Sequence, residues 1–186
     1  MIKYHDTEWG VPLHDDKKLF EFLILESFQA GLSWQIVLNK REAFRKAFNG
    51  FDPAAVADYG DEWLNNLMMD KSIIRNRQKL AASINNARCF IEVQEEFNSF
   101  DTYIWSFVDF KPIINAFSHL TELPARTEIS DKIAVDLKKR GFRFTGPTIV
   151  YAHMQATGMV NDHLVSCFRY HEINGLTAPT ENALNS

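Results

Sequence analysis

The sequence has 186 residues, 46% of them hydrophobic, and a formal net charge of −4 at pH 7. This length and apolar content are enough for one domain with its own core. The two cysteines, Cys89 and Cys167, exclude a disulfide framework, and the sequence contains neither a signal-peptide pattern nor an uncharged run that could span a membrane. We therefore expect a protein of a reducing compartment, located in the cytoplasm, with no membrane partner.

The acidic net charge argues against a nucleic-acid partner, but it averages over two local basic clusters. These clusters are Lys71, Arg75, Arg77 and Lys79, and then Lys132, Lys138, Lys139, Arg140 and Arg143. By itself, such a cluster is more often an ordinary solvated helix face than a binding surface. If DNA is the partner, we expect few phosphate contacts and a weak dependence of affinity on salt.

Residues 1–15 are turn-rich and dense in functional side chains, and a helix is predicted to follow over 16–30. Asp16 is a suitable N-cap for this helix. Its apolar residues are too dense for a single surface stripe, so the helix should be largely buried. The charged residues that mark its expected solvent face are Lys17, Lys18 and Glu21.

Glu26 lies about 135° from that solvent face on a helical wheel of about 100° per residue, so its carboxylate should point toward the core. An isolated buried carboxylate is costly, and no Lys or Arg lies one turn away on the same face. Two interpretations stay open. Glu26 either caps a neighbouring helix or meets a distant arginine, or it belongs to a pocket.

The residues that follow this helix combine a turn with apolar and aromatic side chains. Gly31 should end the helix, and Leu32 should project from the turn. Ser33 can cap a second helix, over 33–48, that opens with Trp34. An acid, a bent backbone, an apolar tip and an indole therefore come together within one short stretch.

Further helices are predicted along the rest of the chain. Short helices are expected over 52–59, 61–69 and 101–107, and a long one over 72–97, where apolar residues recur at three- and four-residue steps. The segment 109–129 is the loosest, because it contains two prolines. Without a repeat, a low-complexity tract or a strand pattern, the predicted fold class is all-α, a compact helical bundle.

The segment after residue 130 has clear helix boundaries. Ser130 is expected to cap a helix that ends near residue 140. A short hairpin should begin at Gly141, and Gly146 with the proline after it should start a helix that runs to Thr157. A helix N-terminus entered through glycine exposes N–H groups that can hold a phosphate. Many helical bundles contain such turns, so the pattern alone does not establish DNA binding.

His163 and Cys167 lie four residues apart, which would place an imidazole and a thiolate on one face of a helix. This spacing suits zinc, although an isolated pair of this kind is more often a coincidence. The polar chain after Ile173 is expected to fray.

Four motifs follow one another in order along nearly the whole chain. They are Tyr4-His5-Asp6 with Glu8-Trp9-Gly10, Leu25-Glu26 with Gln29-Ala30-Gly31-Leu32-Ser33-Trp34, Lys138-Lys139-Arg140-Gly141-Phe142 with Gly146, and Gly158 with Val160-Asn161-Asp162-His163. Together they resemble the 3-methyladenine DNA glycosylase I family, which belongs to the helix-hairpin-helix glycosylase superfamily. The resemblance implies a single DNA glycosylase domain over 1–186, with two helical lobes and a variant helix-hairpin-helix element over about 130–158.

The resemblance also implies roles for individual residues. Glu26 matches the acidic residue that recognises the methylated base and is taken as catalytic. Tyr4 and Trp34 match the aromatic residues that sandwich the base. The implied DNA-binding residues are Leu32, which matches an apolar plug, and the hairpin residues Gly141 and Gly146.

His5, His163 and Cys167 match three zinc ligands of the family. The resemblance implies a structural zinc that ties the N-terminal arm to the C-terminal segment and holds Tyr4 over the pocket. Family members carry a further cysteine and a tryptophan in an upstream Arg-Cys-x-Trp segment, which this sequence does not contain.

Asn161 stands where most of the superfamily has an aspartate, a departure that is typical of this family. The adjacent Asp162 is interpreted as a structural cap. Glu26 is therefore the one acid to which a catalytic role is assigned.

These features predict a monofunctional DNA repair glycosylase that flips out and hydrolyses 3-methyladenine in alkylated double-stranded DNA, with 3-methylguanine as a further candidate substrate. No lysine lies beside the key stretch in the sequence to form a Schiff base. One alternative is a non-catalytic helix-hairpin-helix protein that binds DNA damage, which the missing upstream segment favours. Another is a zinc-bridged helical interaction module. We expect a monomer.

Overall fold

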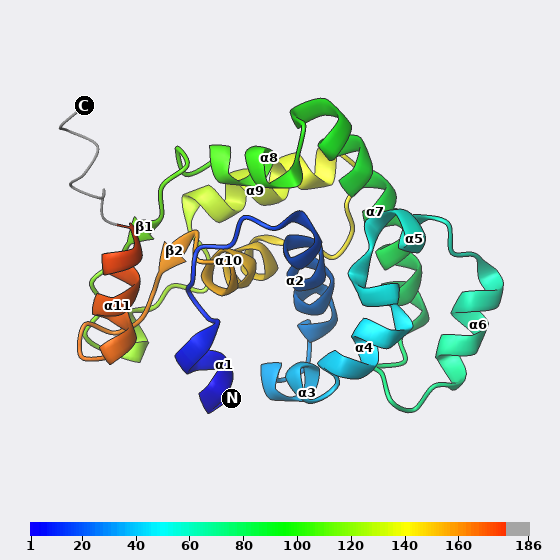
Figure 1. Cartoon of the computed structure of the whole chain (residues 1–186), viewed down its shortest axis with the longest axis horizontal. Helices are drawn as coiled ribbons and strands as arrows, with labels where there is room; N and C mark the ends of the chain where they lie inside the picture. Colours follow the sequence, from blue (N-terminus) through cyan, green and yellow to red (C-terminus); the bar gives the residue numbers. More distant parts are fainter. Residues whose placement is uncertain (178–186) are drawn as a thin grey trace.

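The computed structural model describes residues 1–177, and these form an almost entirely helical fold (Figure 1). The helices are α1 (Ile2–Thr7), α2 (Asp16–Gln29), α3 (Trp34–Asn39), α4 (Arg41–Ala47), α5 (Pro53–Ala57), α6 (Asp61–Met69), α7 (Arg77–Phe97), α8 (Phe100–Ser106), α9 (Glu128–Lys139), α10 (Pro147–Ala156) and α11 (Phe168–Thr177). Short 3-10 helices η1 (Asn49–Phe51) and η2 (Leu120–Glu122) and the strands β1 (Ile113–Ile114) and β2 (Val160–Asn161) complete the set. The predicted all-α class is confirmed. Within this part of the chain, no helix is both long and apolar enough to cross a membrane.

Helix α2 runs through the middle of the molecule (Figure 1), and every residue from Leu19 to Phe28 is buried. It contacts α3, α7, α8 and α10. The helix is surrounded in this way because its apolar residues occupy most of its circumference and must all be removed from water. The prediction of a largely buried helix is confirmed.

The N-cap of α2 is Asp15, whose carboxylate accepts a hydrogen bond from the backbone N–H of Lys18. The prediction of Asp16 as the cap was wrong by one residue. The carboxylate of Asp16 instead accepts from the backbone N–H groups of Phe100 and Asp101, at the start of α8. Either aspartate satisfies the local capping pattern, and only the position of α8 distinguishes them.

Several other helix boundaries differ from the prediction. The turn-rich N-terminal segment contains α1, and the helix predicted over 33–48 is interrupted at Lys40. Helix α7 begins at Arg77 because Asn76 caps it. Helix α9 begins after Thr127, which forms a capping box with Ser130, so Ser130 is not itself the N-cap.

The segment 109–129 contains β1 and η2. β1 pairs in parallel with β2, with Ile113 opposite Val160. Strands of two residues are too short to show alternation of polar and apolar residues, so the sequence pattern did not reveal them. Where fraying was expected after Ile173, α11 continues to Thr177, and the rest of that segment lies outside the described residues.

The N-terminal arm lies beside the C-terminal part of α10 and the strand β2 (Figure 1). The N–H groups of Gly10 and Leu13 donate to the carbonyl oxygens of Gln155 and Thr157. Gly158 has a φ of +71°, and a Cβ built there would lie 2.4 Å from the backbone of the arm. Only glycine therefore lets the arm cross at this point, and the crossing brings α1 next to the segment that precedes α11.

Candidate active site

A cavity of about 360 Å³ lies between α1, α3 and the segment before α11. Tyr4 of α1 and Trp34 of α3 line it together with Trp9 and His163. The ring centroids of Tyr4 and Trp34 lie 5.8 Å apart, and the ring planes are tilted by 57°. The two rings contact each other and leave no parallel slot, so a base can enter between them only after they move apart.

Glu26 lies in the core next to Tyr4 and is 3% exposed. The prediction that its carboxylate points inward is confirmed. Within residues 1–177 it neither caps a helix nor meets an arginine, and no hydrogen bond or ion pair reaches it. Burial raises the pKa of this carboxyl group to about 8. Glu26 does not itself line the cavity, whereas Tyr4 does.

The hydroxyl of Tyr4 is a second buried polar group at this place. It is buried and makes no hydrogen bond of normal geometry with residues 1–177. Burial raises the pKa of Tyr4, the negative charge of Glu26 raises it further, and the indole of Trp34, a polar neighbour of the hydroxyl, only slightly offsets the rise. Unpaired buried polar groups are rare in folded proteins and call for an explanation. The Tyr4 hydroxyl can donate a hydrogen bond and the Glu26 carboxylate beside it can accept one, so the pair is suited to the polar edge of a ligand.

The turn between α2 and α3 separates a buried acid from an exposed apolar side chain. Gly31 has a φ of +83°, which favours glycine, and Leu32 at the tip of the turn is 38% exposed. Ser33 occupies the N-cap position of α3, as predicted, but its hydroxyl makes no capping hydrogen bond. The stretch singled out in the sequence therefore runs from the core at Glu26 to solvent at Leu32.

An ion-pair network that the sequence did not reveal holds α1 against α2. Arg41 donates to both carboxylate oxygens of Glu8, at 2.7 and 2.6 Å, and also to Glu21. The prediction of Glu21 on the solvent face was wrong, because Arg41 and Arg45 of α4 cover it and leave it 5% exposed. Glu8 directly follows α1, so the network fixes the helix that carries Tyr4.

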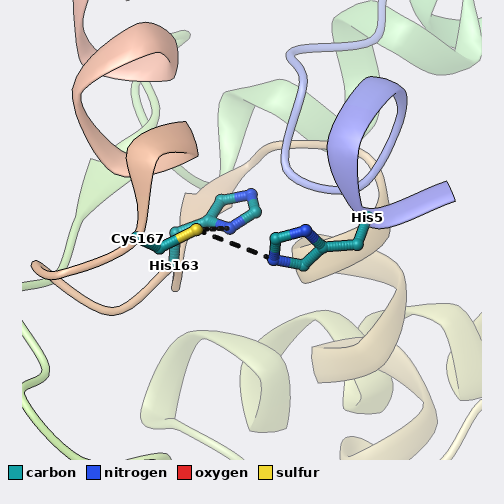
Figure 2. Close-up of side chains that lie close together, drawn as sticks. All are labelled: His5, His163 and Cys167. Carbon is teal, nitrogen blue, oxygen red and sulfur yellow. Dashed lines mark hydrogen bonds between the residues drawn. The ribbon is translucent and has the colours of Figure 1, made fainter. Parts of the chain in front are cut away.

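His5, His163 and Cys167 converge where α1 approaches the segment before α11 (Figure 2). The Sγ atom of Cys167 lies 3.7 Å from Nε2 of His5 and 3.7 Å from Nδ1 of His163. Tetrahedral zinc holds its sulfur and nitrogen ligands about 3.6 Å apart, so these atoms fit the metal. The prediction that His163 and Cys167 share a helical face was wrong, since α11 begins only at Phe168 and a non-helical turn brings them together.

The outer nitrogens of the two histidines are held by hydrogen-bond acceptors. Nδ1 of His5 lies 2.7 Å from the carboxylate of Asp6, and Nε2 of His163 lies 3.1 Å from the carbonyl oxygen of Trp9. Because both partners can only accept, the outer nitrogens carry the protons, and the neutral form of each ring then presents a lone pair toward Cys167. Metal binding needs this protonation state. The described residues provide no fourth ligand in this cluster.

Residues 140–146 join α9 to α10 in a short non-helical connection. Gly141 has a φ of +91°, and Gly146 stands at the N-cap of α10, as predicted. Phe144 is 39% exposed and has a φ of +58°, which is uncommon for a bulky residue. Together with Arg143, Phe144 and Gly146 border a surface cavity of about 490 Å³.

The two basic clusters do not face solvent in full. Lys79 is 6% exposed, and Arg140 is paired with Glu96 and Asp136. The exposed members are Lys71, Arg75, Arg77, Lys132, Lys138, Lys139 and Arg143. The exposed positive surface is therefore smaller than the number of basic residues in the two clusters suggests.

Asp162 borders the cavity, but its oxygens are occupied. They accept hydrogen bonds from Asn115, Tyr151 and Gln155. The interpretation of Asp162 as structural agrees with this bonding, although it links several elements and does not cap one helix. Asn161 is fully buried and donates to the side chain of Asn174.

Comparison with known proteins gives a consistent result. The model of the methyladenine glycosylase family matches residues 1–170. DNA-3-methyladenine glycosylase 1 of Escherichia coli (strain K12) is 48% identical over 169 residues, which cover 91% of this chain and 90% of that protein.

Solved structures agree with the sequence comparison. A crystal structure of 3-methyladenine DNA glycosylase I has a TM-score of 0.88 and 48% identity, and the match covers 90% of this chain and 92% of the other. A structure of 3-methyladenine DNA glycosylase I from Staphylococcus aureus, solved to show the structural basis of 3-methyladenine recognition, has a TM-score of 0.87 and 37% identity over 89% of this chain and 88% of the other. The matched region contains the cavity, Glu26 and the histidine and cysteine cluster, and the chain belongs to the methyladenine glycosylase family.

Proposed function

We propose that this protein excises 3-methyladenine from alkylated double-stranded DNA by hydrolysis and leaves an abasic site without cutting the strand. 3-Methylguanine is a further candidate substrate. The observation that carries the proposal is the buried, unpaired carboxylate of Glu26 beside Tyr4, whose ring contacts Trp34 at the cavity. The relatives are named for glycosylase action on 3-methyladenine, in agreement with this geometry.

The chemistry of the lesion explains why an unpaired acid is useful. Adenine methylated at N3 carries a delocalised positive charge, so its glycosidic bond is already weak and the main task is selection. A cationic base supplies the partner that Glu26 lacks and gains charge-assisted hydrogen bonds in return. Neutral adenine leaves the carboxylate uncompensated or protonated, and is rejected.

Aromatic side chains add a second selection. A flipped base that lies between Tyr4 and Trp34 gains stacking with both rings and, when it is cationic, cation–π attraction. In the free protein these rings contact each other, so base entry is coupled to their separation. The Tyr4 hydroxyl, buried and without a hydrogen bond of normal geometry, is available to the base or to the Glu26 carboxylate.

Hydrolysis passes through a sugar with oxocarbenium character, which the negative charges of Glu26 and of the DNA phosphates stabilise. Water is the nucleophile in this proposal. The sequence placed no lysine beside the key stretch, but the fold brings Lys79 to the end of α2. Its ammonium group donates to two backbone carbonyls and does not line the cavity, so we assign it no role as a nucleophile.

DNA contacts are assigned to two segments. Leu32, exposed at the tip of its turn, fills the space that the flipped base leaves in the stack. Gly141 and Gly146 belong to a variant helix-hairpin-helix element formed by α9, α10 and their connection. The N-terminal amides of α10 can hold a DNA phosphate.

Zinc is assigned to His5, His163 and Cys167 on the fit of the donor atoms and their protonation. The metal, when bound, supplies a cross-link between α1 and the segment before α11 and takes no part in the reaction. Elemental analysis of purified protein, compared with the Cys167→Ser variant, tests this directly. We expect about one zinc per chain in the wild type, from the three converging ligands, and strong depletion in the variant.

The enzymatic proposal is tested by incubating methylated duplex DNA with the protein and separating the released bases by chromatography. We expect free 3-methyladenine and intact strands, with no release from unmethylated DNA. A mobility shift without base release would support the non-catalytic damage-binding alternative. Light scattering after gel filtration tests the expected monomer.

A further inference from the structure

Helix α7 has a buried face with polar side chains. Lys79, Ser83 and Asn86 lie four and then three residues apart, so they share one side of the helix. They are 6%, 1% and 0% exposed. Polar groups are costly on a buried face unless they are paired, so their partners indicate what this face supports.

Lys79 holds the end of α2. Its Nζ atom donates to the carbonyl oxygen of Phe28 at 3.0 Å and to that of Ala30 at 2.8 Å. A helix leaves its last carbonyl groups unsatisfied, and its C-terminus favours a cation. Because Gly31 and Leu32 follow directly, these two hydrogen bonds tie the start of the exposed turn to α7.

Asn86 holds the connection between α9 and α10. Its side-chain amide donates to the carbonyl oxygen of Arg143 at 2.9 Å and accepts from the N–H of the same residue at 2.8 Å. This pairing with both backbone groups resembles that of a neighbouring strand. Asn85 adds a hydrogen bond to the carbonyl oxygen of Gly141 at 2.8 Å.

The two contacts belong to one rigid element. Lys79 and Asn86 are seven residues apart, a separation of about 10 Å along a helix. Between them, the hydroxyl of Ser83 donates to the backbone carbonyl of Lys79. The turn that carries Leu32 and the connection that carries Gly141 are therefore held by the same two helical turns of α7.

We propose that Lys79 and Asn86 are positioning residues that hold the Leu32 turn and the Gly141–Gly146 connection at a set separation for duplex DNA. This inference rests on the proposed function, which assigns both segments to DNA. A plug and a phosphate contact act together only if their spacing matches the duplex, and a displacement of about 1 Å in such a site is costly. Neither residue touches the base in this scheme.

The experiment compares duplex DNA with the free base. Lys79→Met removes both hydrogen bonds to α2, and Asn86→Asp keeps the acceptor for Arg143 while it removes the donor. Lys79→Arg restores a donor to the two carbonyls. Arg88→Met is the control, because Arg88 also lies on α7 and donates to the carbonyl oxygen of Ala57 at the end of α5, and it makes no hydrogen bond to either segment.

We measure affinity for a duplex with a stable abasic analogue, single-turnover release of 3-methyladenine, and affinity for free 3-methyladenine. Lys79→Met and Asn86→Asp should each weaken duplex affinity and slow release by about tenfold or more, since each loses at least one hydrogen bond from a buried side chain to the backbone of a DNA-contacting segment. Affinity for the free base should change by less than about twofold, Lys79→Arg should recover most of the loss, and Arg88→Met should resemble the wild type.

Three results would overturn the inference: wild-type duplex affinity in both variants, an equal loss of free-base affinity, or a covalent adduct of Lys79 with DNA after borohydride treatment. If Lys79→Met does not fold, Asn86→Asp decides the question by the same measurements. If the wild type itself releases no base, the proposed function fails, while the duplex affinities still test the positioning.

Discussion

Two glutamates on α2 have nearly the same burial and opposite surroundings. Glu21 is 5% exposed and accepts hydrogen bonds from Arg41 and Arg45. Glu26, five residues later, is 3% exposed, and no partner reaches it within residues 1–177. Burial without a partner raises the pKa of Glu26 to about 8.

The difference distinguishes a buried acid with a structural role from one that can take part in chemistry. A buried acid that is paired with arginine holds elements together, here α1, α2 and α4. A buried acid without a partner is stable only if it is neutral or if a ligand supplies the missing charge. Burial alone therefore identifies neither role, and the partner decides. The first three predictions that follow apply the same substitution to one or the other of these acids.

The largest effect is expected for Glu26→Gln. Excision of 3-methyladenine should fall by about 100- to 1,000-fold, because a neutral amide cannot compensate the cationic base or the developing positive charge on the sugar. The measurement is base release under single-turnover conditions, with thermal unfolding as the control for the fold. Activity within a few-fold of the wild type would mean that the acid lies elsewhere.

The pH dependence of stability should distinguish the wild type from the same variant. The folded protein keeps a proton on Glu26 up to about pH 8, whereas the unfolded chain loses it at the ordinary value of 4.5. The free energy of unfolding is therefore at its full value with respect to Glu26 below about pH 4.5, and it falls as the pH rises to about 8. Urea unfolding at several pH values should show the wild type losing several kcal/mol relative to Glu26→Gln across this range, and parallel curves would contradict the assignment.

Glu21→Gln should give the opposite pattern. Arg41 keeps Glu8 but loses one charged partner in a buried site, so unfolding should become easier by about 2 kcal/mol. Excision per folded molecule should stay within a few-fold of the wild type. Urea unfolding and base release, measured on the same preparation, test both statements. Lost activity with unchanged stability would remove the distinction between the two acids.

The smallest effect is expected for Trp34→Ala. Loss of stacking should weaken recognition of the cationic lesion by about tenfold, the order expected for one base–aromatic stack. Binding to undamaged duplex should change much less. Competition between methylated and unmethylated duplexes measures the discrimination, and an equal loss on both would refute the stacking role of Trp34.

Local patterns explain the part of the fold that was correctly predicted. The burial of α2 and the inward direction of Glu26 follow from apolar periodicity, which depends on residues three and four positions apart. The same wheel failed for Glu21, because two arginines of α4 cover a face that the pattern assigned to solvent. The turn at Gly31 was also local, since only a glycine there readily adopts the observed φ.

Pairs that are distant in sequence explain what was missed. Spacing suggested His163 and Cys167 as a ligand pair, but the turn that joins them and the approach of His5 depend on how α1 meets the segment before α11. Nothing near Lys79 in the sequence indicates that it holds the end of α2. Its contacts with Phe28 and Ala30 span 51 and 49 residues.

The sequence by itself determined the helical class, the inward carboxylate and the glycine turns, because each depends on neighbours within one or two helical turns. Only the tertiary structure decided which buried charges have partners. The energy of a buried charge depends on the groups that surround it in space, and those groups come from elements far apart in the chain. For this reason Glu21 has two arginine partners and Glu26 has none within the described residues, as the proposed recognition of a cationic base requires.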